Sequence, residues 1–117
     1  RQHFSQVKGG QLALAAYPAP VVTFVVSDVP GDDPAQVASG PTIASQVSIH
    51  EAISFIKSYK ITLPTKIKEY FEEEITSVPS FHDDRFSKNK VKIIASSYLS
   101  LSAAAQKAEE LGFKPYI

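Results

Sequence analysis

The sequence predicts a fold of the α/β class, a three-layer α/β/α, Rossmann-like arrangement around a mainly parallel sheet. An uncharged apolar run that begins at Val21 and ends at Asp28 is typical of a strand buried on both faces. Residues 91–95 are expected to form a second strand, and a helical pattern separates them from a third strand expected at Phe113. A strand, a helix and a strand in this order join parallel strands through a right-handed crossover.

The first residues are expected to be helical. Residues 1–7 are interpreted as the end of a helix, with Lys8 in its last turn and Gly9 as the left-handed residue that ends it. A short helix over residues 11–16 follows, and two prolines stop it before the first strand.

Two capping signals follow that strand. Asp33 has the chemistry to cap a short helix with Pro34 at its first position, and Gly40 is expected to end it. Ser48 and Glu51 fit a capping box for a helix that continues to about Tyr59, whose apolar stripe is expected to face the sheet.

The second half of the chain continues the pattern of helices and strands. A helix is predicted over residues 64–75, and a loop over residues 76–90 leads to the second strand. Ser100 is expected to cap a helix that Gly112 ends, because its apolar residues share one face and glycine commonly follows a helix.

Composition narrows the classes of function. The 117 residues carry 12 basic and 12 acidic side chains, so the chain shows no charge footprint for nucleic acid or an anionic membrane. No apolar run approaches the roughly 18 residues of a membrane-spanning helix, and no leader is visible. The absence of cysteine fits a reducing compartment, and a cytoplasmic protein is expected.

The chain is expected to be a piece of a larger protein. It has no methionine, even at position 1, and residues 115–117 read as the middle of an incoming strand. Unpaired strand edges would then favour self-association, so homo-oligomers are a further expectation.

The carboxyl end of the first strand is the predicted functional site. Ligands of open α/β sheets bind beyond the carboxyl ends of the strands, where Ser27, Asp28, Gly31 and Asp32 are expected. Asp28 could bind a metal–nucleotide, orient a substrate hydroxyl, or cap the loop through backbone N–H groups. Ser97 follows the second strand and is expected to line the same cleft.

Other polar motifs have both structural and functional interpretations. The turn Ser39-Gly40-Pro41-Thr42 could cradle an anion or simply reverse the chain. Lys8 could neutralise phosphate charge or compensate the helix dipole. The three histidines stand far apart in the sequence and are interpreted as surface residues. Neither a P-loop nor a dinucleotide-binding fingerprint is present.

Three motifs in order carry a family resemblance: Lys8-Gly9-Gly10, Ser27-Asp28-Val29-Pro30-Gly31-Asp32 and Ala38-Ser39-Gly40-Pro41-Thr42. Together they resemble the bacterial-type glycerate 2-kinases, some of which carry the older name hydroxypyruvate reductase. The resemblance implies that residues 1–117 belong to the N-terminal α/β domain of a larger enzyme. Such an enzyme transfers the γ-phosphoryl group of ATP to the 2-hydroxyl of D-glycerate and uses a divalent cation.

The resemblance also implies roles for single residues. Asp28 and Asp32 would hold Mg²⁺ or orient the hydroxyl, and Lys8 would contact phosphate or the substrate carboxylate. Contacts to the substrates or ATP would come from the following residues: Ser27, Gly31, Ser39, Gly40, Thr42 and Ser97. A hydroxypyruvate reductase, which the family's older name suggests, and a non-catalytic α/β domain remain alternatives. At Ser96 and Ser97 this chain departs from the family, which tends to have glycine and asparagine there.

Overall fold

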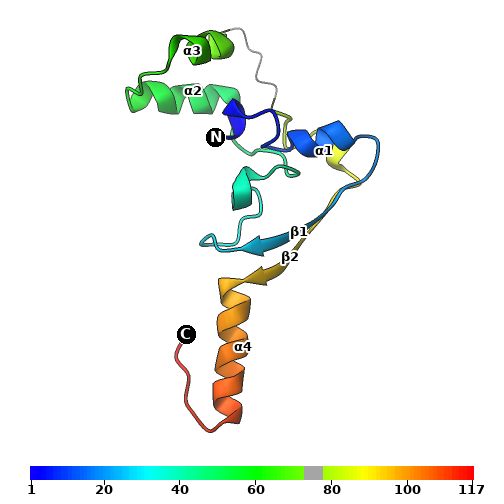
Figure 1. Ribbon diagram of the computed structural model, residues 1–117, viewed down its shortest axis with the longest axis vertical. Helices are drawn as coiled ribbons and strands as arrows, with labels where there is room; N and C mark the ends of the chain where they lie inside the picture. Colours follow the sequence, from blue (N-terminus) through cyan, green and yellow to red (C-terminus); the bar gives the residue numbers. More distant parts are fainter. Residues whose placement is uncertain (73–77) are drawn as a thin grey trace.

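Two parallel strands lie at the middle of the molecule, with helices towards both ends of its long axis (Figure 1). The computed structural model describes residues 1–72 and 78–117. In chain order its elements are the 3₁₀ helix η1 (Gln2–Phe4), α1 (Gln11–Ala16), β1 (Val22–Ser27), η2 (Val37–Ser39), α2 (Ile49–Ser58), α3 (Thr65–Glu72), η3 (Asp84–Phe86), β2 (Lys90–Ser96) and α4 (Ser97–Glu110). The predicted α/β class with parallel strands is therefore confirmed.

The pairing of β1 with β2 fixes which residues meet at the carboxyl edge of the sheet. Val25 pairs with Ile93, but the next residue of β1 pairs with Ala95, so Ile94 is an extra residue in β2. An extra residue of this kind is a β-bulge, which bends the strand and shifts the register by one position. As a result Ser27 lies opposite Ser96 at the end of both strands.

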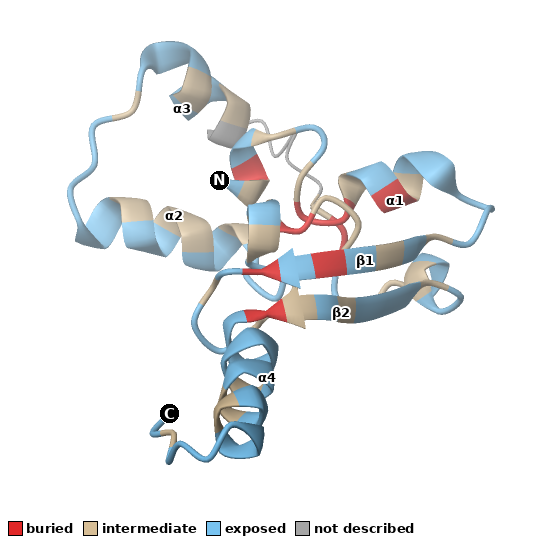
Figure 2. Ribbon diagram, turned by 60° about the horizontal axis from the view of Figure 1, so that its bottom comes forward, coloured by how far each residue is buried: buried red, intermediate tan, exposed pale blue. Residues whose placement is uncertain are grey.

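One face of β1 is uncovered. Val25 and Ser27 are buried, whereas Val22, Phe24 and Val26 on the alternate face are 57%, 64% and 64% exposed (Figure 2). The prediction of a strand buried on both faces is wrong for this chain, because within the described residues nothing covers the second face. Alternate side chains of a strand point to opposite faces, so the exposed and buried residues separate cleanly.

The chain has a small core of its own. Its radius of gyration is 18.7 Å, whereas a compact chain of about 100 residues has one of about 13 Å. The accessible surface is 8666 Å², against about 6,200 Å² for a compact monomer of this mass. The buried apolar residues in the described part of the chain are mostly small: Ala13, Val25, Ala35 and Ala44. Most large apolar side chains therefore keep much of their surface in water.

Residues close in the sequence determine where α1 and α2 begin and end. α1 has the predicted bounds, and α2 begins with the predicted capping box, in which Ser48 Oγ accepts the Glu51 N–H and Glu51 accepts the Ser48 N–H. The prediction that the apolar stripe of α2 faces the sheet is wrong, since α2 lies at the end of the molecule away from α4, with the two strands between them (Figure 1). Within residues 1–72 and 78–117, no helix is both long and apolar enough to cross a membrane.

The N-terminal helix is shorter than predicted. Only η1 forms before Lys8, and the Ser5 hydroxyl then accepts the N–H groups of Val7 and Lys8 in a turn. Gly9 has the predicted left-handed conformation, with φ of 64°. Because no α-helix ends at Lys8, the interpretation of this lysine as a charge that compensates a helix dipole is wrong.

The strand-to-helix connection at the C-terminal side is also tighter than predicted. α4 begins directly after β2, because Ser96 and not Ser100 is its cap: Ser96 Oγ accepts the Leu99 N–H at 3.3 Å. Gly112 follows α4 with φ of 84°, as predicted. The third strand expected at Phe113 is not formed, since residues 113–117 have no regular structure and no strand to pair with.

The connection between α2 and β2 departs from the prediction in one respect. α3 occupies most of the helix predicted over residues 64–75, whose last three residues lie outside the described part of the chain. The predicted loop over residues 76–90 contains η3, which Asp83 caps by accepting the Arg85 N–H. The described part of this segment is therefore locally ordered rather than irregular.

We expect the 117-residue chain to self-associate through the uncovered face of β1, because burying Phe24 and its neighbours removes apolar surface from water. Light scattering should give a mass above 12.7 kDa. Phe24→Lys should return the chain towards the monomer, whereas Tyr116→Lys, which changes an 86% exposed residue outside the sheet, should not. A monomeric wild-type chain at high concentration would contradict this expectation.

Candidate functional site

The carboxyl ends of both strands open into a cavity of about 490 Å³. Four serines line it, namely Ser27, Ser96, Ser97 and Ser100. Ser27 and Ser96 are 4% and 5% exposed and lie opposite each other in the register. The structure thus brings together Ser27 and Ser97, two of the residues that the sequence assigns to one cleft.

The first turn of α4 forms one side of this cavity. Ser96 caps the helix, and Ser100 Oγ donates to the Ser96 carbonyl at 3.0 Å. The N-terminus of a helix presents backbone N–H groups without intrahelical partners and the positive end of the helix dipole. This arrangement can accept an anionic or strongly polar ligand group at the carboxyl edge of the sheet.

Asp28 lies just beyond the cavity and is exposed. No hydrogen bond or ion pair of its carboxylate is found within the described residues, so the interpretation of Asp28 as a loop cap gains no support. The Ser27 hydroxyl takes that role, because it accepts the Val29 N–H at 3.4 Å. The loop turns through Gly31, with φ of 84° and open space around it, and through Asp32, with φ of 51°.

Asp33 in the same loop is structural, as predicted. Its Oδ1 accepts the Ala35 N–H at 3.0 Å, and its Oδ2 accepts the Gln36 side-chain amide at 3.0 Å. The predicted short helix is a turn that leads into η2, and Gly40 ends it with φ of 54°. The carboxylates of Asp28 and Asp33 are chemically alike, but within the described residues only that of Asp33 is hydrogen-bonded.

Backbone hydrogen bonds join two of the motifs that the sequence singles out. The N–H groups of Gly9, Gly10 and Leu12 donate to the carbonyls of Ser39, Gly40 and Pro41 at 3.1, 2.8 and 3.1 Å. We call these three bonds the glycine ladder. They place Lys8 next to the turn at residues 39–42, although more than 25 residues separate the two segments in the sequence.

The glycine ladder requires glycine at two positions. A Cβ atom on Gly10 would lie 2.8 Å from the Phe86 ring and 3.0 Å from the Ala44 Cα. A Cβ atom on Gly40 would lie 2.8 Å from the Ala35 carbonyl oxygen. All three separations are shorter than a van der Waals contact, so the packing around the glycine ladder depends on the missing side chains.

The same contacts limit how the turn can bind an anion. The N–H groups of Ser39 and Gly40 already donate to the carbonyls of Gln36 and Val37, at 2.9 and 3.0 Å. They are not available as a backbone nest, so the Ser39 hydroxyl and the Lys8 ammonium are the better candidates. Lys8 is half-buried, and its ammonium makes no ion pair within the described residues.

Thr42 is held against the sheet away from the serine cavity. Its hydroxyl hydrogen-bonds the Thr23 hydroxyl at 2.7 Å. Thr23 precedes Ser27 by four strand positions, a separation of about 13 Å at 3.3 Å per residue. The structure therefore places Ser27 and Ser97 in one group and Lys8 with the residue 39–42 turn in a second.

A third polar region contains a histidine that the sequence places wrongly. His3 is buried, with 6% of its surface exposed, whereas His50 and His82 are exposed as predicted. It lines a cavity of about 610 Å³ together with His82, Ser45 and Ser80. Sequence spacing gives no signal for this burial, because His3 is covered by segments more than 40 residues away.

Burial governs the protonation of His3. It lowers the pKa of the imidazole below its usual value, and the Val47 backbone carbonyl offsets part of the effect without reaching hydrogen-bond geometry. Neither ring nitrogen has a hydrogen-bond partner within the described residues. An imidazole in such surroundings is favoured in its neutral form.

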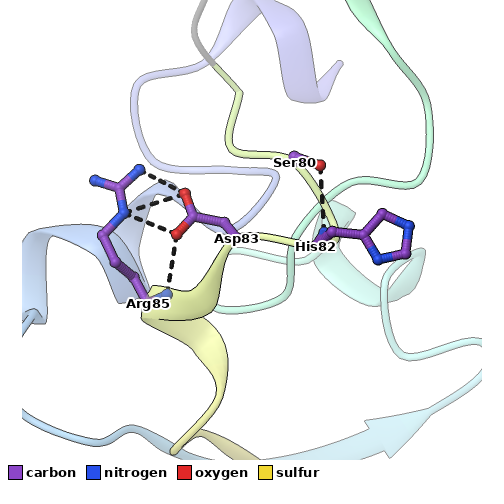
Figure 3. A network of polar contacts seen from close by, with 4 residues as sticks. All are labelled: Ser80, His82, Asp83 and Arg85. Atoms are coloured by element: carbon purple, nitrogen blue, oxygen red, sulfur yellow. Dashed lines mark hydrogen bonds and ion pairs between the residues drawn. The ribbon is translucent and has the colours of Figure 1, made fainter.

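Asp83, which follows His82 in the sequence, forms an ion pair with Arg85 (Figure 3). Arg85 Nε donates to both carboxylate oxygens, at 2.9 and 3.1 Å, and the side-chain and backbone hydrogen bonds from Arg85 lower the pKa of Asp83 to about 2. Ser80 Oγ accepts the His82 N–H at 3.2 Å. These contacts order the loop before β2, and they leave the carboxylate of Asp83 already paired.

Metal ligands are sparse. In the described part of the chain, no group of three or more His, Cys, Asp or Glu side chains could hold a metal ion. A site made entirely by this chain is thus absent from these residues. Mg²⁺, however, is commonly bound by one or two carboxylates, with waters and substrate phosphates as the other ligands. Asp28 and Asp32 fit such an incomplete site.

Parallel strands that end in polar residues beneath a helix N-terminus define an α/β protein, and in open sheets of this class ligands bind at the carboxyl edge. The chain belongs to the DUF4147 family, described as a domain of unknown function, whose profile matches residues 1–72.

Relatives extend the similarity to the whole chain. It is 38% identical over 117 residues to a protein of Agrobacterium vitis named "Putative hydroxypyruvate reductase", covering 100% of this chain and 26% of that protein. It is 38% identical over 120 residues to a glycerate kinase of Macaca fascicularis, covering 100% of this chain and 30% of that protein. A crystal structure of glycerate kinase from Thermotoga maritima matches with a TM-score of 0.78 and 31% identity, over 97% of this chain and 26% of that one.

The chain spans only about a quarter of the length of these relatives, 26% and 30% in the two proteins above. The similarity to the Thermotoga maritima structure confirms the α/β fold of this part. The partial coverage of that structure is consistent with the small core of this chain, because a quarter of a larger fold has faces that other parts of the fold cover.

We expect Gly40→Ala to lower the free energy of unfolding more than Gly112→Ala does. Both glycines have a positive φ, which costs alanine about 1–2 kcal/mol, but only Gly40 has a backbone atom within 4 Å of the new Cβ. The clash should add about 1–3 kcal/mol. Denaturant unfolding of both variants measures the difference, and equal losses would mean that the glycine ladder tolerates a side chain.

Acidification should destabilise the chain through His3. Because burial lowers the folded-state pKa below 6.5, the unfolded chain binds more protons as the pH falls through that value. The free energy of unfolding should therefore fall as the pH is lowered through about 6.5 and below it. His3→Leu should reduce this fall, and His50→Leu, at an exposed position, should not. An unchanged pH dependence in His3→Leu would show that His3 is not the group responsible.

Proposed function

We propose that the whole protein transfers the γ-phosphoryl group of ATP to the 2-hydroxyl of D-glycerate, giving 2-phosphoglycerate. The main support is the match over 97% of this chain to the glycerate kinase of Thermotoga maritima. Relatives named glycerate kinase, such as the human protein with 36% identity, add to it. The chain would be an internal part of the first α/β domain of this enzyme.

Phosphoryl transfer requires positioning of the two substrates and neutralisation of charge on the transferred group. Lys8 supplies a mobile positive charge beside the residue 39–42 turn, where an ammonium can meet phosphate or the carboxylate of glycerate. The Ser39 hydroxyl can donate to the same anion. Gly40 contributes by fitting against the Ala35 carbonyl, where a side chain has no room, and Thr42 by fixing the turn to β1.

The second group of residues would serve the nucleotide and the metal. Ser27 and Ser97 line the cavity at the N-terminus of α4, which suits a phosphate oxygen, and Gly31 leaves the loop open. Asp28 and Asp32 would hold Mg²⁺, or Asp28 would orient the glycerate hydroxyl. When bound, Mg²⁺ supplies positive charge to the phosphate oxygens. Asp28 is suited to this role because its carboxylate is exposed and unpaired within the described residues.

We place the whole protein in the cytoplasm, where ATP and glycerate are available and cysteine-free chains are common. Its partners would be small molecules, since the charge balance of this chain gives no support for nucleic acid or a membrane.

A hydroxypyruvate reductase is the second candidate, because the relatives from Agrobacterium vitis carry that name. The two activities use different cofactors and are separated by direct assay. The full-length protein should be incubated with D-glycerate, ATP and Mg²⁺, and separately with hydroxypyruvate and NADH. Formation of 2-phosphoglycerate in the first assay supports the kinase, whereas NADH oxidation in the second without any phosphoryl transfer would overturn it. A protein inactive in both assays would favour a non-catalytic domain.

Asp28→Asn in the full-length protein should lower kcat/KM by about 10²-fold or more, because the amide keeps the shape of the side chain but loses the charge that Mg²⁺ needs. The matched control is Asp33→Asn in the same loop, where the carboxylate caps a turn. That variant should lose stability and keep most of its turnover. Initial rates and denaturant unfolding on the same preparations measure both effects, and near-wild-type rates for Asp28→Asn would refute the assignment.

Lys8→Ala should weaken catalysis more than stability. Loss of a charge-assisted phosphate contact corresponds to about 1.5–3 kcal/mol of transition-state binding, or a fall in kcat/KM of about 10- to 150-fold. The free energy of unfolding should change little, because Lys8 makes no ion pair in the described residues. Lys92→Ala, on an exposed position of β2, is the control. A large loss of stability with unchanged turnover would make Lys8 a structural residue.

A further inference from the structure

The side chain of Gln2 connects both flanks of the residue 39–42 turn. Its Nε2 donates to the carbonyls of Ala35 and Ser39, at 3.0 and 3.3 Å, and its Oε1 accepts the Ser45 hydroxyl at 2.6 Å. Ala35 precedes the turn, Ser39 is its first residue, and Ser45 follows it. One amide therefore spans the segment from residue 35 to residue 45.

Chemistry fixes the orientation of this amide. The nitrogen faces two carbonyl oxygens, so an exchange of nitrogen and oxygen would set like atoms against each other and lose both bonds. Ala35 and Ser45 are 7% and 5% exposed, which shields the contacts from water. Hydrogen bonds in such surroundings are costly to leave unmade, so the bridge restrains the segments that it joins.

The turn needs such a restraint. Ala38 and Ser39 have φ of 51° and 63°, in the left-handed region that residues with a Cβ atom rarely adopt. Strained residues of this kind persist only where the surrounding structure holds them. The Ser39 carbonyl is held twice, by the Gly9 N–H of the glycine ladder and by Gln2 Nε2.

We propose that Gln2 is a positioning residue that holds the residue 39–42 turn in the shape needed to bind an anionic substrate group. This inference rests on the proposed function for its link to catalysis. As a positioning residue, Gln2 does not itself touch the substrate. It acts through the Ser39 carbonyl, and so sets where the Ser39 hydroxyl and the neighbouring Lys8 lie.

Two variants of the full-length protein test this role. Gln2→Leu removes all three hydrogen bonds, and Gln2→Glu keeps the acceptor for Ser45 but turns an oxygen towards two carbonyls. Gln46→Glu, an exposed amide after the turn, controls for the added charge. At neutral pH we expect both Gln2 variants to raise the KM for ATP or for D-glycerate at least tenfold, with the other KM changed less than twofold. Gln46→Glu should leave both constants unchanged.

Gln2→Glu adds a readout that general damage to the fold would not give. A protonated carboxyl can again donate to a carbonyl, so the affected KM should recover towards the wild-type value, measured at the same pH, as the pH is lowered. A fall in kcat with both KM values unchanged would indicate only a loss of folded enzyme, and it would overturn the proposal. So would a raised KM in Gln2→Glu that does not respond to pH.

Hydrogen exchange separates this inference from the proposed function. The amides of Ser39 and Gly40 are hydrogen-bonded within the turn, and in Gln2→Leu they should exchange at least tenfold faster, while amides in the middle of α4 do not change. If the wild-type protein fails to phosphorylate glycerate, the proposed function fails, and faster exchange still shows that Gln2 holds the turn. Unchanged exchange of Ser39 and Gly40 would overturn the positioning role whatever the activity.

Discussion

The glycine ladder is the constraint on which the arrangement of the chain depends. It joins residues 9–12, at the start of α1, to residues 39–41, at the end of η2. Gly10 and Gly40 have no room for a side chain there, because a Cβ atom would meet Phe86, Ala44 or Ala35. The second segment continues to β1, where Thr23 holds Thr42. Backbone bonds of this kind place Lys8 and Ser39 side by side without fixing either side chain, which leaves both free for a ligand.

The rest of the structure is held more loosely. Buried apolar residues are few and small in the described part of the chain, so hydrogen bonds and close backbone contacts carry much of the local order. β1 shows the consequence most clearly, since one of its faces is packed and the other carries Phe24 in contact with water. Thr23, which holds Thr42, lies about 13 Å from Ser27 along this strand at 3.3 Å per residue.

Local chemistry made much of the fold predictable. The bounds of α1 and the capping box of Ser48 and Glu51 depend on residues close in the sequence, and both are confirmed. The prediction of Ser100 as the cap of α4 is wrong, because Ser96 lies at the strand end and caps the helix first. The predicted third strand failed because a strand forms only against a partner, and this chain supplies none in the described residues near Phe113.

The candidate site was predictable only in part. The position of Asp28 after an apolar strand gave a clear signal, and the contrast with Asp33 followed from turn chemistry. The burial of His3 and the bridge made by Gln2 had no such signal, because both depend on segments more than 30 residues away in the sequence. Tertiary contacts of this kind decide which polar residues are held and which remain free, and no local pattern records them.

The β-bulge at Ile94 determines which side chains meet at the carboxyl edge of the sheet. Counting from Val25 and Ile93, regular pairing of the same sequence without a bulge would set Ser27 beside Ala95 and Asp28 beside Ser96. The bulge leaves Ile94 unpaired and shifts each later partner by one position, so two hydroxyls meet and Asp28 lies past the last pair of the two strands. The bulge thus separates the uncharged serines of the cavity from the carboxylate that follows them.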